Sequence, residues 1–207
     1  MNRPPARLAL VLPFDPARAT PWAETLDAAL GAGDVACVLL RASGPDQALA
    51  PFLESLRAVA HGHDVALLLE DRIELAAQAG CDGVHLRAAE AVAAARQHLG
   101  AEAIVGAGCG GSRHGAMVAG EAGADYVAFG HPGPDAVPAE AELLAWWQAV
   151  MTVPCLAFGA ETPAAATAMA RAGADFVAVE RAVLDHPEGP AAGARACATA
   201  LGATGTD

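Results

Sequence analysis

The chain has 207 residues and a formal net charge of −12, and its residues are 54% hydrophobic but only 4% aromatic. This length fits one domain over residues 1–207, with a core built mainly from Ala, Val and Leu. The acidic balance argues against a nucleic-acid partner, because a phosphate backbone requires a basic surface, and no apolar run approaches the roughly 20 residues of a membrane span. All twelve basic residues are arginine, which excludes lysine Schiff-base chemistry.

The first predicted strand, residues 8–12, also has to be distinguished from a signal peptide. Arg3 and Arg7 precede it and Ala17-Arg18-Ala19 follows it, but the apolar stretch is short and Pro13 interrupts it. Five cysteines are scattered singly along the chain without a CxxC pair, as expected of reduced thiols. We therefore expect a cytoplasmic protein.

Seven further short apolar runs follow in chain order and predict buried strands at 35–40, 65–69, 83–86, 103–107, 126–129, 154–158 and 176–179. Continuous apolarity is typical of strands that are covered on both faces. The predicted helices alternate with these strands at 21–30, 47–60, 72–79, 89–99, 113–122, 139–151, 163–172 and 189–201. Thr162 followed by Pro163 is a favourable helix start. Strict alternation with short connections indicates parallel βαβ units.

A repeated phrase runs through the chain and ends each time on an aspartate: Asp34, Asp82, Asp125 and Asp175, which lie 48, 43 and 50 residues apart. The phrase predicts a helix that ends on glycine, a short polar turn and a buried strand. Each period is long enough for two βα units, so four periods predict an α/β fold of the (βα)8 TIM-barrel class. The rival is an open doubly wound sheet, which the lack of a GxGxxG motif after the first strand disfavours as a dinucleotide-binding fold.

In such a barrel, residues just after each strand face one shared mouth. The residues at these positions are Asp15, Arg41, Glu70, Asp71, His85, Arg87, residues 106–111, His131, Gly159, Ala160, Glu161, Glu180 and Arg181. Carboxylates, arginines and glycine-bearing loops together suit a small anionic molecule bound with Mg²⁺.

Several of these residues also have a structural interpretation. Asp71 either binds metal or caps the following helix, and His85 either binds substrate or is a hydrogen-bonded core histidine. The glycine-rich segment 106–111 either cradles phosphate or forms a flexible turn. Outside the mouth, Trp146 and Trp147 predict helix packing or a contact between copies in a homo-oligomer.

Glu70-Asp71-Arg72 and residues 79–86 (AGCDGVHL) resemble the central segment of the thiamine phosphate synthases. The similarity continues in the family's order through 122–130 (AGADYVAFG), 153–159 (VPCLAFG) and 172–179 (AGADFVAV). The chain thus resembles a divergent member of the thiamine phosphate synthase and thiazole tautomerase superfamily. The resemblance implies a barrel enzyme that joins hydroxymethylpyrimidine diphosphate to thiazole phosphate. In the enzymes of that family, Mg²⁺ and cationic groups stabilise the departing pyrophosphate while the thiazole nitrogen attacks the carbocation, and the resemblance implies the same chemistry here.

The resemblance also implies roles at matching positions. Asp71 and Glu90 stand where the family has metal-binding aspartates, and Arg41 matches a catalytic arginine. The substrate-binding positions carry changed residues: Glu70 replaces asparagine, Gly108 replaces serine, Ala160 after Gly159 replaces glycine, and Arg181 after Glu180 replaces serine.

Other departures remove or oppose positive charge. The family's glutamine and lysine around Arg41 are Leu39 and Ser43, and its Thr-x-Thr-Lys segment is replaced by residues 131–135 (HPGPD). Glu161 and Glu180 add negative charge near the expected phosphate loops. Arg181 therefore either binds the phosphate or pairs with Glu180 and fills the pocket.

Phe129-Gly130-His131 supports a second interpretation, because thiazole tautomerases resemble the synthases and carry a histidine in this sequence context. One histidine can shift a proton on a thiazole carboxylate phosphate as a general acid and base, without a metal. A third interpretation is an inactive barrel that binds a small phosphorylated heterocycle as a regulator.

Overall fold

Eight parallel strands form a closed ring in the computed structural model, which describes residues 4–16, 21–133 and 135–202. Each strand pairs with its neighbour in sequence, and the first also pairs with the last, with Leu8 opposite Val177. The predicted TIM barrel is confirmed, and the open sheet is wrong. The strands are β1 (Arg7–Leu12), β2 (Val35–Leu40), β3 (Ala66–Glu70), β4 (Gly83–Leu86), β5 (Ile104–Gly110), β6 (Tyr126–Phe129), β7 (Cys155–Ala157) and β8 (Phe176–Val179).

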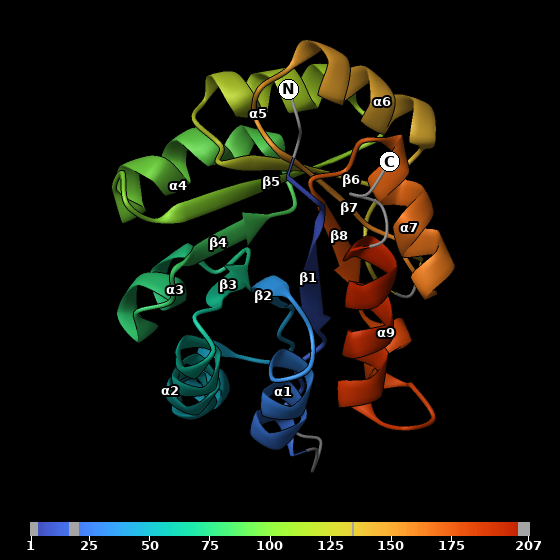
Figure 1. Cartoon of the computed structure of the whole chain (residues 1–207). Helices are drawn as coiled ribbons and strands as arrows, with labels where there is room; N and C mark the ends of the chain where they lie inside the picture. Colours follow the sequence, from blue (N-terminus) through green and yellow to red (C-terminus); the bar gives the residue numbers. More distant parts are fainter. Residues whose placement is uncertain (1–3, 17–20, 134, 203–207) are drawn as a thin grey trace.

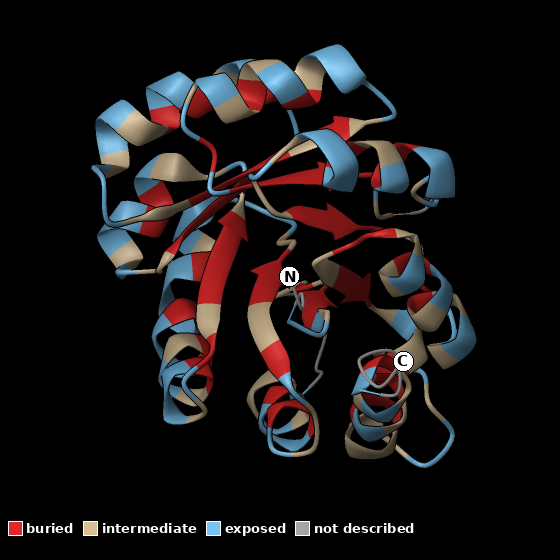
Figure 2. Ribbon diagram, turned by 45° about the horizontal axis from the view of Figure 1, so that its top comes forward, coloured by how far each residue is buried: buried red, intermediate tan, exposed pale blue. Residues whose placement is uncertain are grey.

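Helices surround the ring and turn their apolar faces toward the strands (Figure 1, Figure 2). Thr162 caps α7 as predicted, because its Oγ1 accepts a hydrogen bond from the backbone N–H of Ala165 at 3.1 Å. The helices are α1 (Trp22–Leu30), α2 (Asp46–Gly62), α3 (Ile73–Ala79), the 3₁₀ turn η1 (Ala89–Ala91), α4 (Val92–Leu99), α5 (Arg113–Glu121), α6 (Ala141–Val150), α7 (Pro163–Ala172), α8 (Arg181–Leu184) and α9 (Pro190–Gly202).

The sequence prediction differs from the structure mainly at the mouth. The glycine-rich segment 106–111 is not a loop, because β5 extends through Gly110. The predicted helix 89–99 is divided into η1 and α4. The helix α8 was not predicted, since four residues are too few to show a helical period.

The aspartates of the repeat fasten the opposite end of the barrel, where the strands begin. Three of them accept a hydrogen bond from a backbone N–H of the preceding strand, whereas Asp34 accepts from Nε of Arg7 at 2.9 Å. Each bond ties the start of one strand to the turn before the next, so the repeat fastens neighbouring strands to each other in pairs at the base. The three bonds join Leu67 N to Asp82 at 2.8 Å, Val105 N to Asp125 at 2.7 Å, and Cys155 N to Asp175 at 2.8 Å.

Two clusters of buried side chains form the core. The larger cluster lies between the strands and the helices, and the smaller one fills the interior of the barrel. Tyr126 belongs to the interior cluster, and a Cβ atom on Gly106 would overlap its ring. The missing side chain at Gly106 therefore makes room for an aromatic ring near the floor of the mouth.

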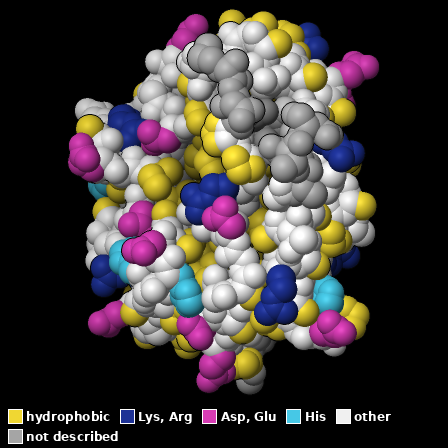
Figure 3. Space-filling view, viewed as in Figure 1, with side chains coloured by type: hydrophobic (Ala, Val, Ile, Leu, Met, Phe, Trp, Pro, Cys, Tyr) yellow, Lys and Arg dark blue, Asp and Glu magenta, His cyan; other side chains and the backbone are white. Residues whose placement is uncertain are grey.

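The surface matches the composition of the chain. On the face drawn in Figure 3, basic side chains of the described residues are scattered among acidic ones and form no broad patch. Within the described ranges, no helix is both long enough and apolar enough to cross a membrane. The sequence also predicts a disordered tail at about residues 202–207. Gly202 ends α9, and residues 203–207 lie outside the described residues, as do Arg3 and Ala17-Arg18-Ala19.

Candidate functional site

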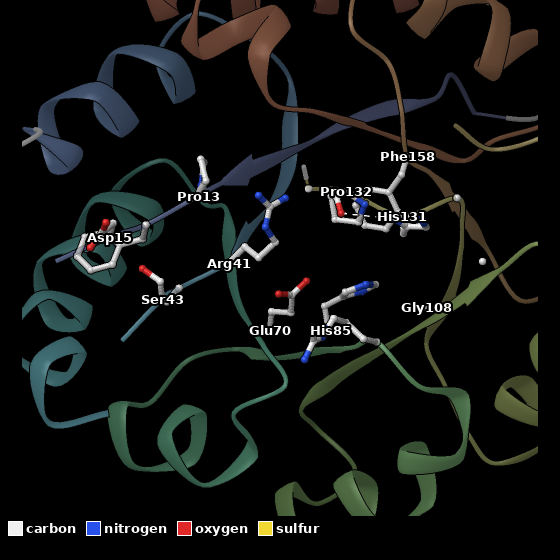
Figure 4. Close-up of a pocket in the computed structure, with 16 residues that line it drawn as sticks. Pro13, Asp15, Arg41, Ser43, Glu70, His85, Gly108, His131, Pro132 and Phe158 are labelled. Carbon is white, nitrogen blue, oxygen red and sulfur yellow. Dashed lines mark hydrogen bonds between the residues drawn. The ribbon is translucent and has the colours of Figure 1, made fainter. Parts of the chain in front are cut away.

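A cavity of about 920 Å³ opens at the C-terminal ends of the strands. It brings together five residues that the sequence indicates for catalysis or substrate binding: Arg41, Glu70, His85, Gly108 and His131 (Figure 4). Its size falls within the range of small-molecule sites. The other residues that line it are Pro13, Phe14, Asp15, Ala42, Ser43, Arg87, Gly110, Gly130, Pro132, Gly133 and Phe158.

Arg41, just after β2, provides a half-buried cation at the cavity. Its Nη1 lies 3.0 Å from Oε2 of Glu180, which follows β8 and is 139 residues away in sequence. The carboxyl group of Glu70 lies between the Arg41 side chain and the His85 ring (Figure 4). Burial raises the pKa of Glu70, and the nearby guanidinium of Arg41 opposes that rise. The mouth thus holds a cation between two carboxyl groups, and a stronger anion can compete for it.

His85 on β4 combines the two roles considered for it, because it is buried and also lines the cavity. Its Nδ1 lies 2.9 Å from the hydroxyl oxygen of Tyr126. Burial lowers the pKa of His85 to about 4, so its ring is neutral near pH 7.

Asp71 follows β3 in the left-handed conformation, with φ of 53°. Its Oδ1 accepts a hydrogen bond from the backbone N–H of Arg87 at 2.8 Å, and its Oδ2 pairs with the Arg87 guanidinium. The capping interpretation is wrong, because α3 begins at Ile73 and its start has no side-chain cap. Asp71 instead fastens the end of β3 to the residue after β4.

The two predicted metal ligands do not line the cavity themselves. Glu90 is exposed on η1, and Asp71 reaches the cavity only through Arg87. Across the described residues, no group of three or more metal-ligating side chains comes together. Mg²⁺ in phosphate-handling sites is often held by one or two carboxylates plus substrate oxygens. The carboxylate oxygens of Asp71 and Glu90 are donors of the kind that Mg²⁺ prefers, and the Arg87 side chain that pairs with Asp71 is 71% exposed.

A second hollow of only about 30 Å³ adjoins the cavity and shares Pro132, Gly133 and Phe158 with it. Nη2 of Arg181 lies 2.8 Å from Oε2 of Glu161, and both side chains are exposed. The expectation that Arg181 pairs with Glu180 is therefore wrong, because Glu180 binds Arg41 instead. The remaining predicted substrate-binding residues line this hollow: Gly159, Ala160, Glu180 and Arg181.

His131 follows β6 and is exposed at the edge of the cavity. Its backbone forms an isolated antiparallel β-bridge with Val137, and its Nδ1 lies 3.5 Å from the carbonyl oxygen of Pro132. Gly130, at φ 72°, lets the chain turn here, because a Cβ atom would meet the carbonyl oxygen of Val137. The ring of His131 is thus placed at the mouth by a constrained turn.

The glycines of β5 bring backbone to the cavity wall. Gly108 lines the cavity, and a Cβ atom there would lie 3.2 Å from the carbonyl oxygen of Leu86. Gly106 and Ala107 are paired with β4 on one side and β6 on the other, and Gly108 and Gly110 are paired with β6, so the flexible-turn interpretation is wrong for residues 106–110.

Comparison with known proteins agrees with this geometry. The sequence profile of the family described as "Thiamine monophosphate synthase" matches residues 9–183. The chain belongs to this family. A protein named thiamine-phosphate synthase from Rhodospirillum centenum is 50% identical over 90% of this chain and 93% of its own length. A protein of the same name from Hyphomonas neptunium is 43% identical over 94% of this chain and 93% of its own length.

Structural comparison supports the fold of this thiamine monophosphate synthase family member. The structure of a thiamine phosphate pyrophosphorylase from Pyrococcus furiosus superposes with a TM-score of 0.82 at 23% identity, and 96% of each chain is covered. At that identity the likeness speaks for the barrel alone. The interpretation of the chain as divergent is not confirmed, because relatives in the family share up to half of its residues over nearly their full length.

Some residues of the site in this family member were not singled out from the sequence. Phe14 and Phe158 supply the aromatic walls of the cavity, and Tyr126 lies beneath His85. Apolar residues at strand ends look like core residues in a sequence, so nothing marks them as part of a site. The one sequence feature that could have predicted the position of Tyr126 is Gly106, because a glycine inside a strand indicates that another group approaches the backbone closely.

Proposed function

We propose that this chain is a thiamine phosphate synthase, which joins hydroxymethylpyrimidine diphosphate to thiazole phosphate and releases pyrophosphate. The observation that carries the proposal is the cavity of about 920 Å³ at the barrel mouth, which holds the cations Arg41 and Arg87 beside the carboxyl group of Glu70. Named synthases share up to half of the chain's residues, which supports the same chemistry here.

The diphosphate is expected at the side of the cavity where Arg41 and Arg87 lie. Guanidinium groups form paired, charge-assisted hydrogen bonds with phosphate oxygens, so both arginines can exchange a carboxylate partner for the diphosphate. Gly108 allows the backbone to approach the substrate closely. Asp71 and Glu90 are the residues that would hold Mg²⁺. Mg²⁺ would supply positive charge that stabilises the departing pyrophosphate.

The bond change needs no proton transfer. The thiazole nitrogen donates its electron pair to the pyrimidine methylene carbon, and the bond from that carbon to the diphosphate oxygen breaks. The electron pair of the broken bond leaves with pyrophosphate. The chain's contribution is therefore to position both heterocycles and to stabilise the leaving anion electrostatically.

The phosphate of the thiazole is expected at the smaller hollow, since barrels of this class often bind phosphate with the loops after strands 7 and 8. Gly159 and Ala160 provide backbone there, and Arg181 provides a cation once it releases Glu161. Because the pair between Arg181 and Glu161 is exposed, water already competes with it and its release costs little. Glu180, from the same loop, would orient Arg41 until the diphosphate takes its place.

A second candidate is tautomerase-like proton transfer by His131. The observation that favours it is the exposed position of this ring at the cavity, where its nearest polar partner is 3.5 Å away. In the synthase, the same position would place His131 against the bound heterocycles.

The experiment mixes the purified protein with both precursors and Mg²⁺ and measures thiamine phosphate and pyrophosphate. The proposal expects equal amounts of both products, a requirement for Mg²⁺, and a large loss of rate in Arg41→Ala. Arg195→Ala, on the exposed face of α9, is the matched control and should keep the full rate.

The rival functions predict different results in the same experiment. Proton exchange on a thiazole carboxylate phosphate that needs His131, without product from the two precursors, would establish the tautomerase instead. Binding of the precursors without any turnover would establish the inactive barrel.

We further propose that the activity resides in a single domain over residues 1–207 and in the cytoplasm. The five cysteines are all free, which agrees with a reducing compartment. Small phosphorylated heterocycles are the proposed partners, and association of copies into a homo-oligomer is testable by sedimentation of the purified chain.

A further inference from the structure

A polar pair lies inside the barrel beneath the floor of the cavity. The rings of His85 and Tyr126 stack with their centroids 5.8 Å apart and their planes 13° apart. Nδ1 of His85 and the hydroxyl oxygen of Tyr126 are 2.9 Å apart. The two side chains are only 3% and 6% exposed, so water does not replace this hydrogen bond.

Strand register explains why the two residues meet across an intervening strand. His85 on β4 is paired with Gly106 on β5, and Gly106 is paired with Tyr126 on β6. Gly106 has no side chain, so the tyrosine ring crosses over it and its hydroxyl reaches the histidine. The three residues form one layer of the barrel interior, next to Glu70, which is paired with His85 from β3.

The direction of this hydrogen bond determines which nitrogen of His85 carries the proton. Burial raises the pKa of Tyr126 well above its ordinary value, so the hydroxyl keeps its hydrogen. A phenol is a stronger donor than a neutral imidazole N–H, and an unprotonated imidazole nitrogen is a stronger acceptor than a phenol oxygen. The favoured arrangement is therefore Tyr126 O–H donating to Nδ1, which leaves the hydrogen of the neutral ring on Nε2.

The other ring nitrogen, Nε2, has no hydrogen-bond partner among the described residues, although the ring lines the cavity. Phe158 packs edge-on against the ring, with centroids 5.5 Å apart, and limits its rotation. An N–H group on Nε2 is therefore held in a fixed orientation without an acceptor among the described residues.

We propose that Tyr126 is a positioning residue that holds His85 in its Nε2–H tautomer, so that the floor of the cavity offers a neutral N–H donor to an acceptor atom of the bound ligand. Such an acceptor is typical of a nitrogen heterocycle, whose ring nitrogen carries a lone pair. The identity of the ligand rests on the proposed function, whereas the tautomer does not.

The test reads the tautomer directly by ¹H–¹⁵N NMR of histidine side chains in the ligand-free protein. The signals of His85 are those that disappear in His85→Phe. We expect an unprotonated Nδ1 and a protonated Nε2 in the wild type. In Tyr126→Phe, which removes one oxygen atom, we expect both nitrogens to shift toward the values of mixed tautomers.

Thr167→Val is the matched control, because it removes a partly buried hydroxyl on α7 and should leave the His85 signals unchanged. Tyr126 is the only tyrosine of the chain, so tyrosine labelled at Cζ gives a single ¹³C signal that reports its protonation directly. A protonated Nδ1 in the wild type, or an unchanged tautomer in Tyr126→Phe, would overturn the proposal. The wild-type spectrum alone decides the first point even if the variant does not fold.

The second readout is kinetic. In Tyr126→Phe the KM for the pyrimidine diphosphate should rise about five- to tenfold with kcat changed less, as expected when one neutral hydrogen bond to a ligand is weakened. An unchanged KM in a variant whose tautomer has shifted would overturn the role in ligand binding. Absence of turnover in the wild type would instead refute the synthase proposal and leave the tautomer result standing.

Discussion

The two ends of the barrel are built in different ways. At the base, the same residue type solves the same problem repeatedly, since Asp82, Asp125 and Asp175 each accept a backbone N–H from the preceding strand. At the mouth, every strand ends differently, and the ion pairs join residues that are far apart in sequence, such as Arg41 and Glu180. The base is therefore built from one repeated contact, whereas each contact at the mouth occurs only once.

The hydrogen bonds and ion pairs at the two ends also differ in whether a ligand can take the place of one partner. The aspartates at the base bind main-chain donors of the strands themselves, so a ligand cannot take their place without opening the ring. At the mouth, the pairs of Arg41 with Glu180 and of Arg181 with Glu161 are side chain to side chain, and the second pair is exposed. An anionic ligand can exchange with a carboxylate there, which predicts that the base determines stability and the mouth determines activity.

The largest effect is expected on the rate of thiamine phosphate formation, and a matched pair of aspartates, one at each end of the barrel, tests it. Asp71 at the mouth and Asp64 near the base are the described non-glycine residues with positive φ, at 53° and 56°. Asp71→Asn should lower the rate of thiamine phosphate formation about 100-fold, because an amide cannot hold Mg²⁺ or Arg87 as a carboxylate does. Asp64→Asn should keep the rate. Equal rates in the two variants, measured at saturating substrates, would remove Asp71 from the mechanism.

The next largest effect is on the free energy of unfolding, and it compares two glycines of the segment 106–111. A Cβ atom on Gly106 would overlap the ring of Tyr126, whereas nothing lies within 4 Å of a Cβ atom on Gly111. Gly106→Ala should lower the free energy of unfolding by about 3 kcal/mol, and Gly111→Ala should leave it nearly unchanged. Urea unfolding of both variants checks this, and equal stabilities would show that Tyr126 does not occupy the space above Gly106.

At the base, Asp125→Ala should lower the free energy of unfolding by about 2 kcal/mol, because the buried N–H of Val105 loses its acceptor and Arg96 loses its carboxylate partner. The rate per folded molecule should not change. Glu54→Ala, on the exposed face of α2, serves as the control for loss of a carboxylate. A fall in activity without a fall in stability would contradict the structural role given to the repeat.

The smallest effect is the pH dependence of stability that arises from His85. The pKa of this group is lowered from 6.5 to about 4 in the folded chain, so between these values the unfolded chain binds more protons than the folded one. Its contribution to stability is therefore complete above pH 6.5 and is lost as the pH falls toward 4. Unfolding at pH 7 and pH 5 should show a loss of up to about 2 kcal/mol in the wild type relative to His85→Phe. A parallel pH dependence in the two proteins would mean that folding does not lower the pKa of His85.

The sequence predicted the base and the barrel well because both depend on local, repeated patterns. The phrase that ends in Asp82, Asp125 or Asp175 carries its own helix end, turn and strand, and four copies are enough to count the units. The boundary of β5 failed where glycines continue the strand beyond residue 107, at Gly108 and Gly110, since local composition alone does not separate a glycine-rich strand from a loop.

The site was predicted in part, because residues after strands converge in any barrel of this kind. Arg41, Glu70 and His85 do line one cavity, but their partners depend on contacts across the ring. Asp71 was open to two interpretations because its positive φ, which turns the carboxylate toward Arg87, is invisible in the sequence. The pairing of Arg181 with Glu161 rather than with Glu180 likewise depends on the path of two loops.

The most direct test of the division between the two ends is an amide ¹H–¹⁵N NMR titration with magnesium pyrophosphate. The shifts should concentrate around Arg41, Glu70 and Gly108 at the mouth, while the amides of Leu67, Val105 and Cys155 at the base stay in place. Shifts centred on the base, or no shifts at the mouth at saturating pyrophosphate, would contradict the assignment of anion binding to this end of the barrel.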